Sequence, residues 1–313
     1  MKTVRNVSIF LLLITSYLLL ATGVRAQTGR GFSVSPPTLD FSLKPGEKTE
    51  RTIKITNRSD ETLYFVANVE DFIVTDKNGT PELLPPGTLP DNKFAASTWT
   101  AIIPDSLTVM PGKSATTSLY LQVPGNARPG GRYVSVAFKP LGGAGPESSG
   151  AAVSTVIGTL VYLTVEGPIE ENARIIQFTA PRFSEYGPIA FTTEIKNLGD
   201  LHITPKATVE IKNILGRKAY SFALDNLNIF PATSRIYKNS WEKKLLFGRF
   251  TANLSGYYGK DNTLPLTAVI AFWVIPYKLI TIVLLAIAIV LIGSFYLKRR
   301  QEPQEIVEER QKV

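Results

Sequence analysis

The stretch TERTIKITN, residues Thr49–Asn57, has apolar side chains at every second position near its end. Ile53 and Ile55 therefore lie on one side of an extended chain and Lys54 on the other. The same alternation recurs in SLYLQV (118–123) and RYVSVAFK (132–139). We expect these strands to form a β-sandwich in which each has one buried and one solvated face. Each buried Leu, Ile or Phe contributes about 1.5 to 3 kcal/mol.

Turn residues separate these strands. Lys44-Pro45-Gly46-Glu47 and Met110-Pro111-Gly112-Lys113 each place proline before glycine, the order that a type II turn requires. Asp76-Lys77-Asn78-Gly79 resembles the start of a calcium loop. It lacks the acidic ligands that would follow, and its Asn-Gly pair is typical of a hairpin. We therefore interpret Asp76–Gly79 as a hairpin turn.

The pattern continues in a second half that begins after Gly167-Pro168. There TTEIKNLGD (192–200) repeats Thr, Ile, Asn and Asp of TIKITNRSD (52–60) in register, 140 positions later. Asn and Asp at such places can cap the turn between two strands. We therefore predict an all-β fold of two tandem domains, residues 27–167 and 168–276, related by duplication of one fold.

An uncharged apolar stretch, LITIVLLAIAIVLIGSFYL, occupies residues 279–297. As a helix rising about 1.5 Å per residue it is long enough to cross a bilayer. Aromatic and basic residues, which favour membrane interfaces, flank it: Trp273, Tyr277, Lys278, Lys298, Arg299 and Arg300. By the positive-inside rule we expect residues 298–313 to form a cytoplasmic tail and the two β-domains to be exported.

The N-terminal residues 1–26 read as a signal peptide. Lys2 and Arg5 precede an apolar core, and Val24-Arg25-Ala26 resembles a cleavage site, so we expect cleavage after Ala26. An uncleaved anchor is the alternative. In either case the segment that follows is exported, which predicts a single-pass protein of the cell membrane with an outside N-terminal region.

The net charge of +8 at pH 7 does not indicate nucleic-acid binding. Residues 27–276 carry 25 Lys/Arg and 22 Asp/Glu, so most of the excess lies in the leader and around the apolar stretch. The chain has no cysteine and one histidine, His202, which we place in an exposed hairpin. These residues offer neither a thiol nucleophile nor a histidine pair for zinc. We predict a non-enzymatic protein without a cofactor or a small-molecule substrate.

Two loops differ from the rest in composition. Residues 140–152, PLGGAGPESSGAA, resemble a flexible hairpin tip, whereas residues 81–96 are long and proline-rich. Loops on a β-sandwich often carry recognition, although solvent-exposed slack is the other interpretation. The candidate partner-binding residues in the second loop are Pro85, Pro86, Lys93 and Phe94.

Leu264-Pro265-Leu266-Thr267-Ala268 resembles a sortase signal ahead of an apolar span. Ala268 stands where the motif has glycine, and ten residues separate it from the span. The other interpretation makes it the start of the last strand of the second domain, with Ile270 and Phe272 in the core. We favour the strand.

Longer stretches carry a family resemblance. SVSPPTLDFSLKPGEKTERTIKITNRSDETLYF (33–65) and STWTAIIPDSLTVMPGKSATTSLYLQVPGNARPGGRYVSVAF (97–138) are similar to the first domain of bacterial WxL-interacting surface proteins. NIFPATSRIYKNSW (228–241), LFGRFTANLSGYYG (246–259) and AFWVIPYK (271–278) are similar to their membrane-proximal domain. The chain itself lacks the W-x-L motifs of the partner proteins.

The resemblance implies two immunoglobulin-like (Ig-like) β-sandwich domains that contact a cell-wall polymer or a surface-protein partner. The leading hypothesis is therefore a membrane-anchored bacterial binding or scaffolding arm. The alternative is a membrane-tethered chaperone or an accessory of secretion or pilus assembly, because Ig-like pairs also donate strands to exported clients. A free edge strand beside a basic cleft between the domains would favour this alternative.

Overall fold

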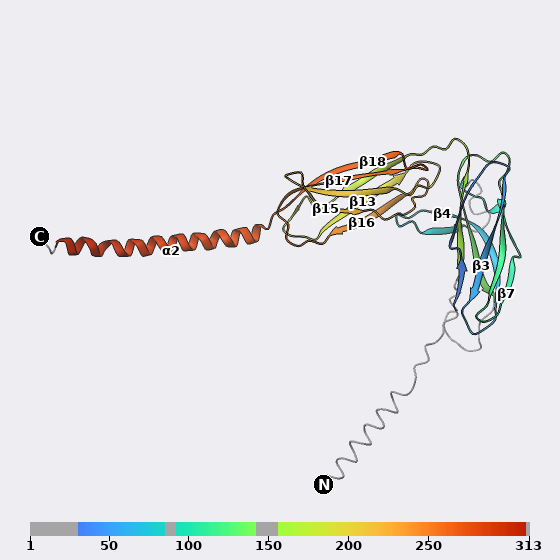
Figure 1. The fold of residues 1–313 in the computed structure, drawn as a ribbon, viewed down its shortest axis with the longest axis horizontal. Helices are drawn as coiled ribbons and strands as arrows, with labels where there is room; N and C mark the ends of the chain where they lie inside the picture. The colour runs from blue at the N-terminus through green and yellow to red at the C-terminus, as the bar shows by residue number, and fades with distance from the viewer. Residues whose placement is uncertain (1–30, 85–91, 142–155, 311–313) are drawn as a thin grey trace, which may run out of the picture.

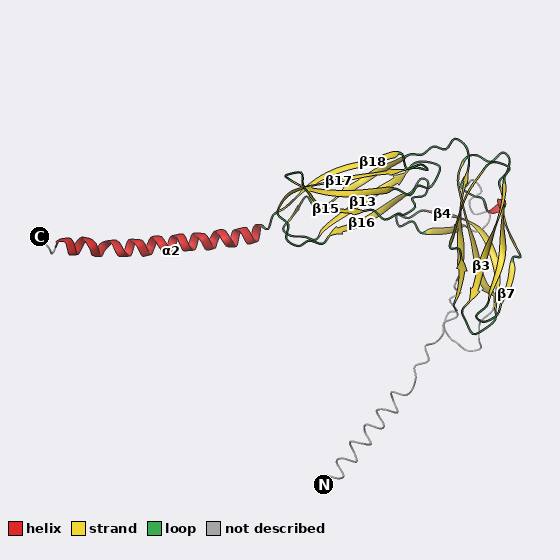
Figure 2. Ribbon diagram, viewed as in Figure 1, coloured by secondary structure: helices red, strands yellow, loops and turns green. Residues whose placement is uncertain are grey.

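Two β-sandwiches follow one another along the chain, and a long helix follows the second (Figures 1 and 2). The computed structural model describes residues 31–84, 92–141 and 156–310, with side chains up to residue 298. The predicted signal peptide with Ala26, the loop residues Pro85 and Pro86, and most of the 140–152 loop lie outside the described residues.

The first domain packs a four-stranded sheet against a six-stranded sheet. The four-stranded sheet has the order β1 (Phe32–Ser35), β3 (Lys48–Asn57), β8 (Ser114–Gln122), β6 (Thr100–Ile103). The other sheet has the order β2 (Thr38–Leu43), β10 (Ile157–Val165), β9 (Gly130–Leu141), β4 (Leu63–Val74), β5 (Pro81–Leu84), and β7 (Ser106–Val109) also pairs with β4. A 3-10 turn, η1 (Ser97–Trp99), leads into β6.

The core of the first domain confirms the alternation in β3 and β8. Ile53, Ile55, Leu119 and Leu121 are fully buried between the two sheets. Both predicted proline-glycine turns are present as well. The N–H of Glu47 donates to the Lys44 carbonyl and that of Lys113 to the Met110 carbonyl, each at 3.0 Å. Gly46 and Gly112 take the positive φ of +85° and +66° that the turns need.

Strand β9 departs from the predicted pattern. We expected one solvated face, but every residue from Gly130 to Phe138 is buried. Val134, Val136 and Phe138 face the core as predicted. On the other face the Tyr133 ring is covered by Phe94 and by Phe230 of the second domain. The solvated-face prediction is therefore wrong for β9, because a neighbouring domain packs there.

The second domain packs a three-stranded sheet against a five-stranded sheet. The first has the order β11 (Ala173–Thr179), β13 (Ile189–Asn197), β16 (Ser234–Trp241). The second has the order β12 (Phe183–Ser184), β18 (Leu264–Val274), β17 (Gly248–Tyr258), β14 (Lys206–Asn213), β15 (Lys218–Ala223). Each domain is thus an Ig-like β-sandwich, and the fold class is all-β as predicted.

Strand β18 contains the sortase-like residues Leu264–Ala268. Leu266 is buried in the core of the second domain, and its neighbour Thr267 pairs with Ser255 of β17. Phe272 lies further along the same strand and packs against Phe191 and Phe250. The structure therefore places this motif in the last strand, as we favoured.

Helix α2 (Tyr277–Arg310) follows β18 after Ile275 and Pro276. Its segment Tyr277–Lys298 has a mean hydropathy of 2.7 and buries none of its apolar window against the protein. Its 22 residues correspond to roughly 33 Å of helix, which is enough to cross a bilayer. Figure 1 shows that α2 extends away from the second domain and that the strands of the first domain run across those of the second.

Candidate functional site between the two domains

The hairpin that joins β4 to β5 reaches from the first domain onto the second. The Lys77 carbonyl accepts the N–H of Ile236 in β16 at 3.1 Å. The Lys77 ammonium lies 2.9 and 3.1 Å from the two carboxylate oxygens of Glu194 in β13, whose side chain is buried. This ammonium, by hydrogen bonding, holds the pKa of Glu194 below its ordinary value. The hairpin thus joins the domains by both main-chain and charged contacts.

Asp76 shapes this hairpin internally. One of its carboxylate oxygens accepts the Thr80 N–H at 2.8 Å and the other accepts the Thr80 hydroxyl at 2.7 Å. Both bonds lower the pKa of Asp76, and the one from the hydroxyl has the larger effect. Gly79 takes a φ of +72°, and six residues separate β4 from β5. The hairpin interpretation of Asp76–Gly79 is therefore confirmed, with a longer connection than a two-residue turn.

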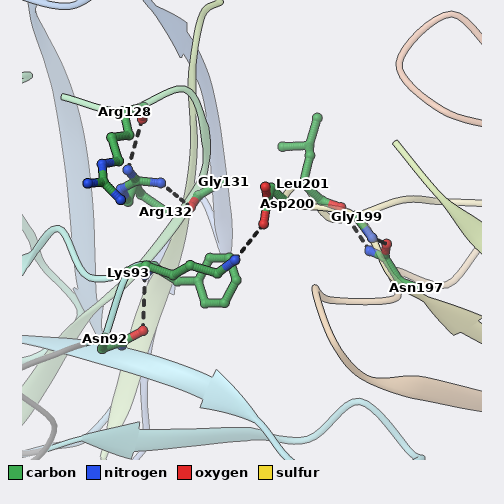
Figure 3. Close-up of polar contacts among 10 residues, drawn as sticks. Asn92, Lys93, Arg128, Gly131, Arg132, Asn197, Gly199, Asp200 and Leu201 are labelled. Atoms are coloured by element: carbon green, nitrogen blue, oxygen red, sulfur yellow. Dashed lines mark hydrogen bonds and ion pairs between the residues drawn. The ribbon is translucent and has the colours of Figure 1, made fainter. Parts of the chain in front are cut away.

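A second contact centres on Asp200 (Figure 3). Lys93 of the first domain places its ammonium 2.6 Å from an Asp200 carboxylate oxygen, and the Asp200 carbonyl accepts the Gly131 N–H at 2.8 Å. The Lys93 ammonium also lies 4.9 Å from the centre of the Phe94 ring. Asp200 therefore contacts two separate segments of the first domain.

Hydrogen bonds hold the loop that carries Lys93 and Phe94. Asp71 in β4 accepts the N–H groups of Ala96 and Ser97 at 2.7 and 2.8 Å and the Ser97 hydroxyl at 2.6 Å. The Phe94 carbonyl accepts the N–H of Tyr133 at 2.9 Å. These bonds hold the described end of the loop against the sandwich, so this end is not solvent-exposed slack.

Asn197 positions Asp200. Its amide donates to the carbonyls of Leu201 and Ile229, at 2.8 and 2.9 Å, and its oxygen accepts the Gly199 N–H at 2.9 Å. Asn57, its counterpart in the first domain, donates to Glu61 and Val109 and accepts from Ser59. Both side chains are fully buried. The repeated sequence thus marks one turn-capping arrangement used in both domains.

Aromatic rings fill the space between these contacts. The Phe72, Tyr133, Tyr162 and Phe230 rings pack with centroid distances of 5.0 to 6.2 Å, and His202 joins them 5.7 Å from Tyr133. Three of these residues come from the first domain, whereas Phe230 and His202 come from the second. The cluster therefore forms a small core shared by the two domains, and we call this core, together with the Lys77 and Asp200 contacts around it, the joint.

His202 lies in this joint and not in the exposed hairpin that we expected. Its N–H donates to the Tyr133 hydroxyl oxygen at 2.8 Å, and its ring nitrogen Nδ1 lies 3.4 Å from the same oxygen. Burial lowers the pKa of His202 and raises that of Tyr133. The expectation of exposure was wrong because the first domain covers the turn.

Two pockets flank the joint, each of about 490 Å³. The first lies where β4 meets the turn before β16 and is lined by Phe72, Phe94, Tyr133, Phe230, Lys77 and Lys196, among others. The second has a more polar wall that includes Asp40, His202, Lys206 and Lys260. The first pocket combines aromatic walls with the ammonium of Lys196, while that of Lys77 is already paired with Glu194. This composition suits an apolar ligand group beside an anionic one.

The residues that the sequence singled out lie in different places. Lys93 and Phe94 belong to the joint, and their role in partner binding stays a prediction. Trp273, Tyr277 and Lys278 lie where the second domain meets α2, and Lys278 pairs with Glu185 at 2.9 Å. Lys298, Arg299 and Arg300 lie further along α2, the last two with side chains that are not described.

Sequence reasoning missed Tyr133, Tyr162 and Phe230. A signal existed for the first, because an aromatic residue on the predicted wet face of a strand is a candidate for contact with another element. Within the described ranges, we find no group of three or more His, Asp or Glu side chains placed to hold a metal ion.

Neither a protein-family model nor a curated protein matches this sequence. Solved structures do resemble it. The class 5 fimbriae chaperone CfaA is 15% identical with a TM-score of 0.40, over 76% of this chain and 98% of that one. The E. coli chaperone DraB is 11% identical with a TM-score of 0.36, over 78% and 95%. A Salmonella enterica SafA pilin–SafB chaperone structure is 10% identical with a TM-score of 0.38, over 77% and 97%. These similarities concern the fold alone.

Proposed function

We propose that this protein is a non-enzymatic binding arm of a bacterial cell surface, anchored by α2 with its β-domains outside and its C-terminus in the cytoplasm. The observation that carries the proposal is the first pocket of the joint, which both domains build. We propose a surface-protein segment as its ligand. This arrangement fits the resemblance to WxL-interacting proteins, whose partners are surface proteins.

The contacts around the pocket support recognition by a preformed site. Lys77 and Lys93 pair with Glu194 and Asp200 of the second domain, and the Tyr133 hydroxyl accepts from His202. A site whose walls are already held in place loses little conformational entropy when a ligand binds. The bent two-domain arm therefore presents a shaped pocket at a fixed point along its length.

The pocket lining favours a polypeptide over a cell-wall polymer as the ligand. Phe72, Phe94 and Phe230 offer apolar surface for a large side chain, and Lys196 offers a positive charge for a carboxylate. A wall polymer remains the second candidate of the same class. Co-sedimentation of the protein with isolated cell walls is the test for it.

Crosslinking on intact cells tests the site. Thr75 lines the pocket and is exposed, so a photoreactive residue there, as Thr75→benzoylphenylalanine, would contact a bound partner. Met110→benzoylphenylalanine is the matched control, because Met110 is exposed in the first domain outside this pocket. We expect a discrete protein adduct from position 75 and none from position 110. Equal labelling from both positions would reject the pocket as the binding site.

A membrane-tethered chaperone or pilus-assembly accessory is the second candidate function. A basic residue in a pocket between Ig-like domains, Lys196, favours it, whereas Lys77 there is paired with Glu194. The last strand of the first domain, β10, argues the other way. It pairs with β2 along Leu160–Val165 and is therefore not a free edge strand that could bind a client. A chaperone would bind only newly exported clients, so crosslinks from position 75 should disappear when protein synthesis is stopped.

A further inference from the structure

Three loops lie at the end of the second domain from which α2 emerges (Figure 1). We call them the base: residues 182–186, which include the two-residue strand β12, residues 214–218, which end at the first residue of β15, and residues 243–247. Register places them together, since Gly248 pairs with Val274, Phe183 with Trp273 and Asn213 with Phe250. The Gly187 N–H also donates to the Lys244 carbonyl at 3.0 Å. The base therefore surrounds the point where the chain enters the helix.

The base exposes large apolar side chains. Outside α2, the four most exposed large hydrophobic residues of the described chain all lie here: Ile214 (70%), Leu215 (73%), Leu245 (74%) and Phe247 (72%). Each sits near the tip of a loop between two strands. Moving such side chains out of water lowers the free energy, and clusters of them mark contact surfaces.

Basic side chains accompany these apolar tips. All are exposed: Arg182, Arg217, Lys218, Lys243 and Lys244. Glu242 is the one exposed acidic residue in these three segments and the residues next to them. Glu185 is half-buried and pairs with Lys278. Apolar tips flanked by lysine and arginine match the chemistry of a bilayer surface that contains anionic lipids.

Short connections tie the base to the helix. Ile275 and Pro276 alone separate β18 from α2, and the Ile275 N–H donates to the Ser184 carbonyl at 3.0 Å. The Phe183 ring lies 6.2 Å from the Tyr277 ring. Where α2 crosses a bilayer, the base is consequently held beside the headgroups.

We propose that the base is a lipid-binding surface: Ile214, Leu215, Leu245 and Phe247 enter the interface of the bilayer that α2 spans, and the basic side chains bind anionic phosphates. This contact orients the second domain on the membrane, and through the joint it sets the position of the first. The proposal rests on the anchoring of α2 and is independent of the partner at the joint.

Site-specific fluorescence on the full chain tests this proposal. The chain has no cysteine, so Leu215→Cys and Phe247→Cys each introduce a single attachment point for an environment-sensitive dye. Met110→Cys is the matched control, because Met110 is 64% exposed and lies in the first domain. Ile287→Cys reports on the span itself. Each protein is reconstituted into phosphatidylcholine vesicles, with or without phosphatidylglycerol, and quenched by nitroxide-labelled lipid or by aqueous iodide.

We expect lipid-borne nitroxide to quench the dyes at 215, 247 and 287, and iodide to quench the dye at 110. Phosphatidylglycerol should increase lipid quenching at 247, and adding Lys243→Gln and Lys244→Gln should remove that increase. Dyes at 215 and 247 that behave like the dye at 110 would overturn the proposal. So would shielding from iodide without lipid quenching, since this would mean a protein occupant. If the dye at 287 also escapes lipid quenching, α2 does not span the bilayer, and the proposed contact of the base with that bilayer is rejected as well.

Discussion

The hydroxyl oxygen of Tyr133 lies 2.8 Å from the backbone nitrogen of His202 and accepts its hydrogen bond across the joint. Tyr133 comes from a central strand of the first domain and His202 from a turn of the second. A side chain of one domain thus satisfies a backbone group of the other. The joint is therefore part of the folded structure of both domains.

Tyr133→Phe should weaken the joint. The ring can stay in the aromatic cluster, but the His202 N–H loses its acceptor, which costs about 1 to 3 kcal/mol for a buried donor. Urea unfolding of the full chain in detergent micelles, followed by tryptophan fluorescence, measures the change in the free energy of unfolding. Tyr64→Phe, at an exposed position, is the control and should leave that free energy unchanged. Equal effects of the two variants would contradict the role of the hydroxyl.

His202 should make stability depend on pH. Burial lowers its pKa in the folded protein, while the nearby Asp40 raises it to a smaller extent. The unfolded chain therefore binds a proton more readily, and the free energy of unfolding should fall as the pH drops below about 6.5. Because this is the one histidine of the sequence, His202→Gln should flatten the profile between pH 6.5 and 5. An unchanged profile in this variant would refute the assignment.

The strands of both domains could be predicted from sequence because burial follows a period of two in residues such as Ile53 and Ile55. The proline–glycine pairs correctly predicted the turns at Gly46 and Gly112. This signal is also local, because glycine readily adopts the positive φ that such a turn requires. The failures concern long-range packing. Tyr133 was placed in solvent because its cover comes from another domain.

The joint shows the same limit. Composition singled out Lys93 and Phe94, but it could not identify Asp200 or Tyr133 as their neighbours. The repeat around Asn57 and Asn197 was visible in the sequence and proved to mark buried caps. What the sequence lacks is the placement of two domains relative to each other, on which the environment of His202 depends.

The ion pair of Lys77 with Glu194 should add stability that acid removes. Lowering of the Glu194 pKa means that its contribution is present above the ordinary carboxylate pKa and is lost as the pH falls through the folded-state value. Lys77→Met should cost about 1 to 3 kcal/mol at pH 7, because it leaves a buried carboxylate without its charged donor. The exposed pair of Lys93 with Asp200 provides the comparison, and Lys93→Met should cost less than about 1 kcal/mol. Thermal unfolding at pH 7 and at pH 3.5 distinguishes the two pairs.

Gly79→Ala tests the docking of the hairpin. Gly79 has a φ of +72°, and a Cβ at this position would overlap the guanidinium of Arg235 in the second domain. Gly112→Ala is the matched control, since Gly112 has a φ of +66° with open space around its would-be Cβ. Both variants should lose about 1 kcal/mol from backbone strain. The guanidinium is the flexible end of its side chain and can move aside, so the further loss for Gly79→Ala is that of its hydrogen bond to the Asn228 carbonyl, about 0.5 to 1.5 kcal/mol. We read it as faster hydrogen exchange of the Ile236 N–H, which Gly112→Ala should leave protected.

Asn57→Ala and Asn197→Ala should each destabilise their own domain. Either change removes a buried amide that donates to two carbonyls and accepts from a backbone N–H, so we expect a loss of about 3 kcal/mol. Hydrogen exchange read by mass spectrometry separates the domains by peptide. Asn57→Ala should raise exchange mainly in β3 and β8, and Asn197→Ala mainly in β13 and β16. Because Asn197 also positions Asp200, its variant alone should expose the Gly131 N–H at the joint. Protection at Gly131 that survives Asn197→Ala would show that the cap and the joint are independent.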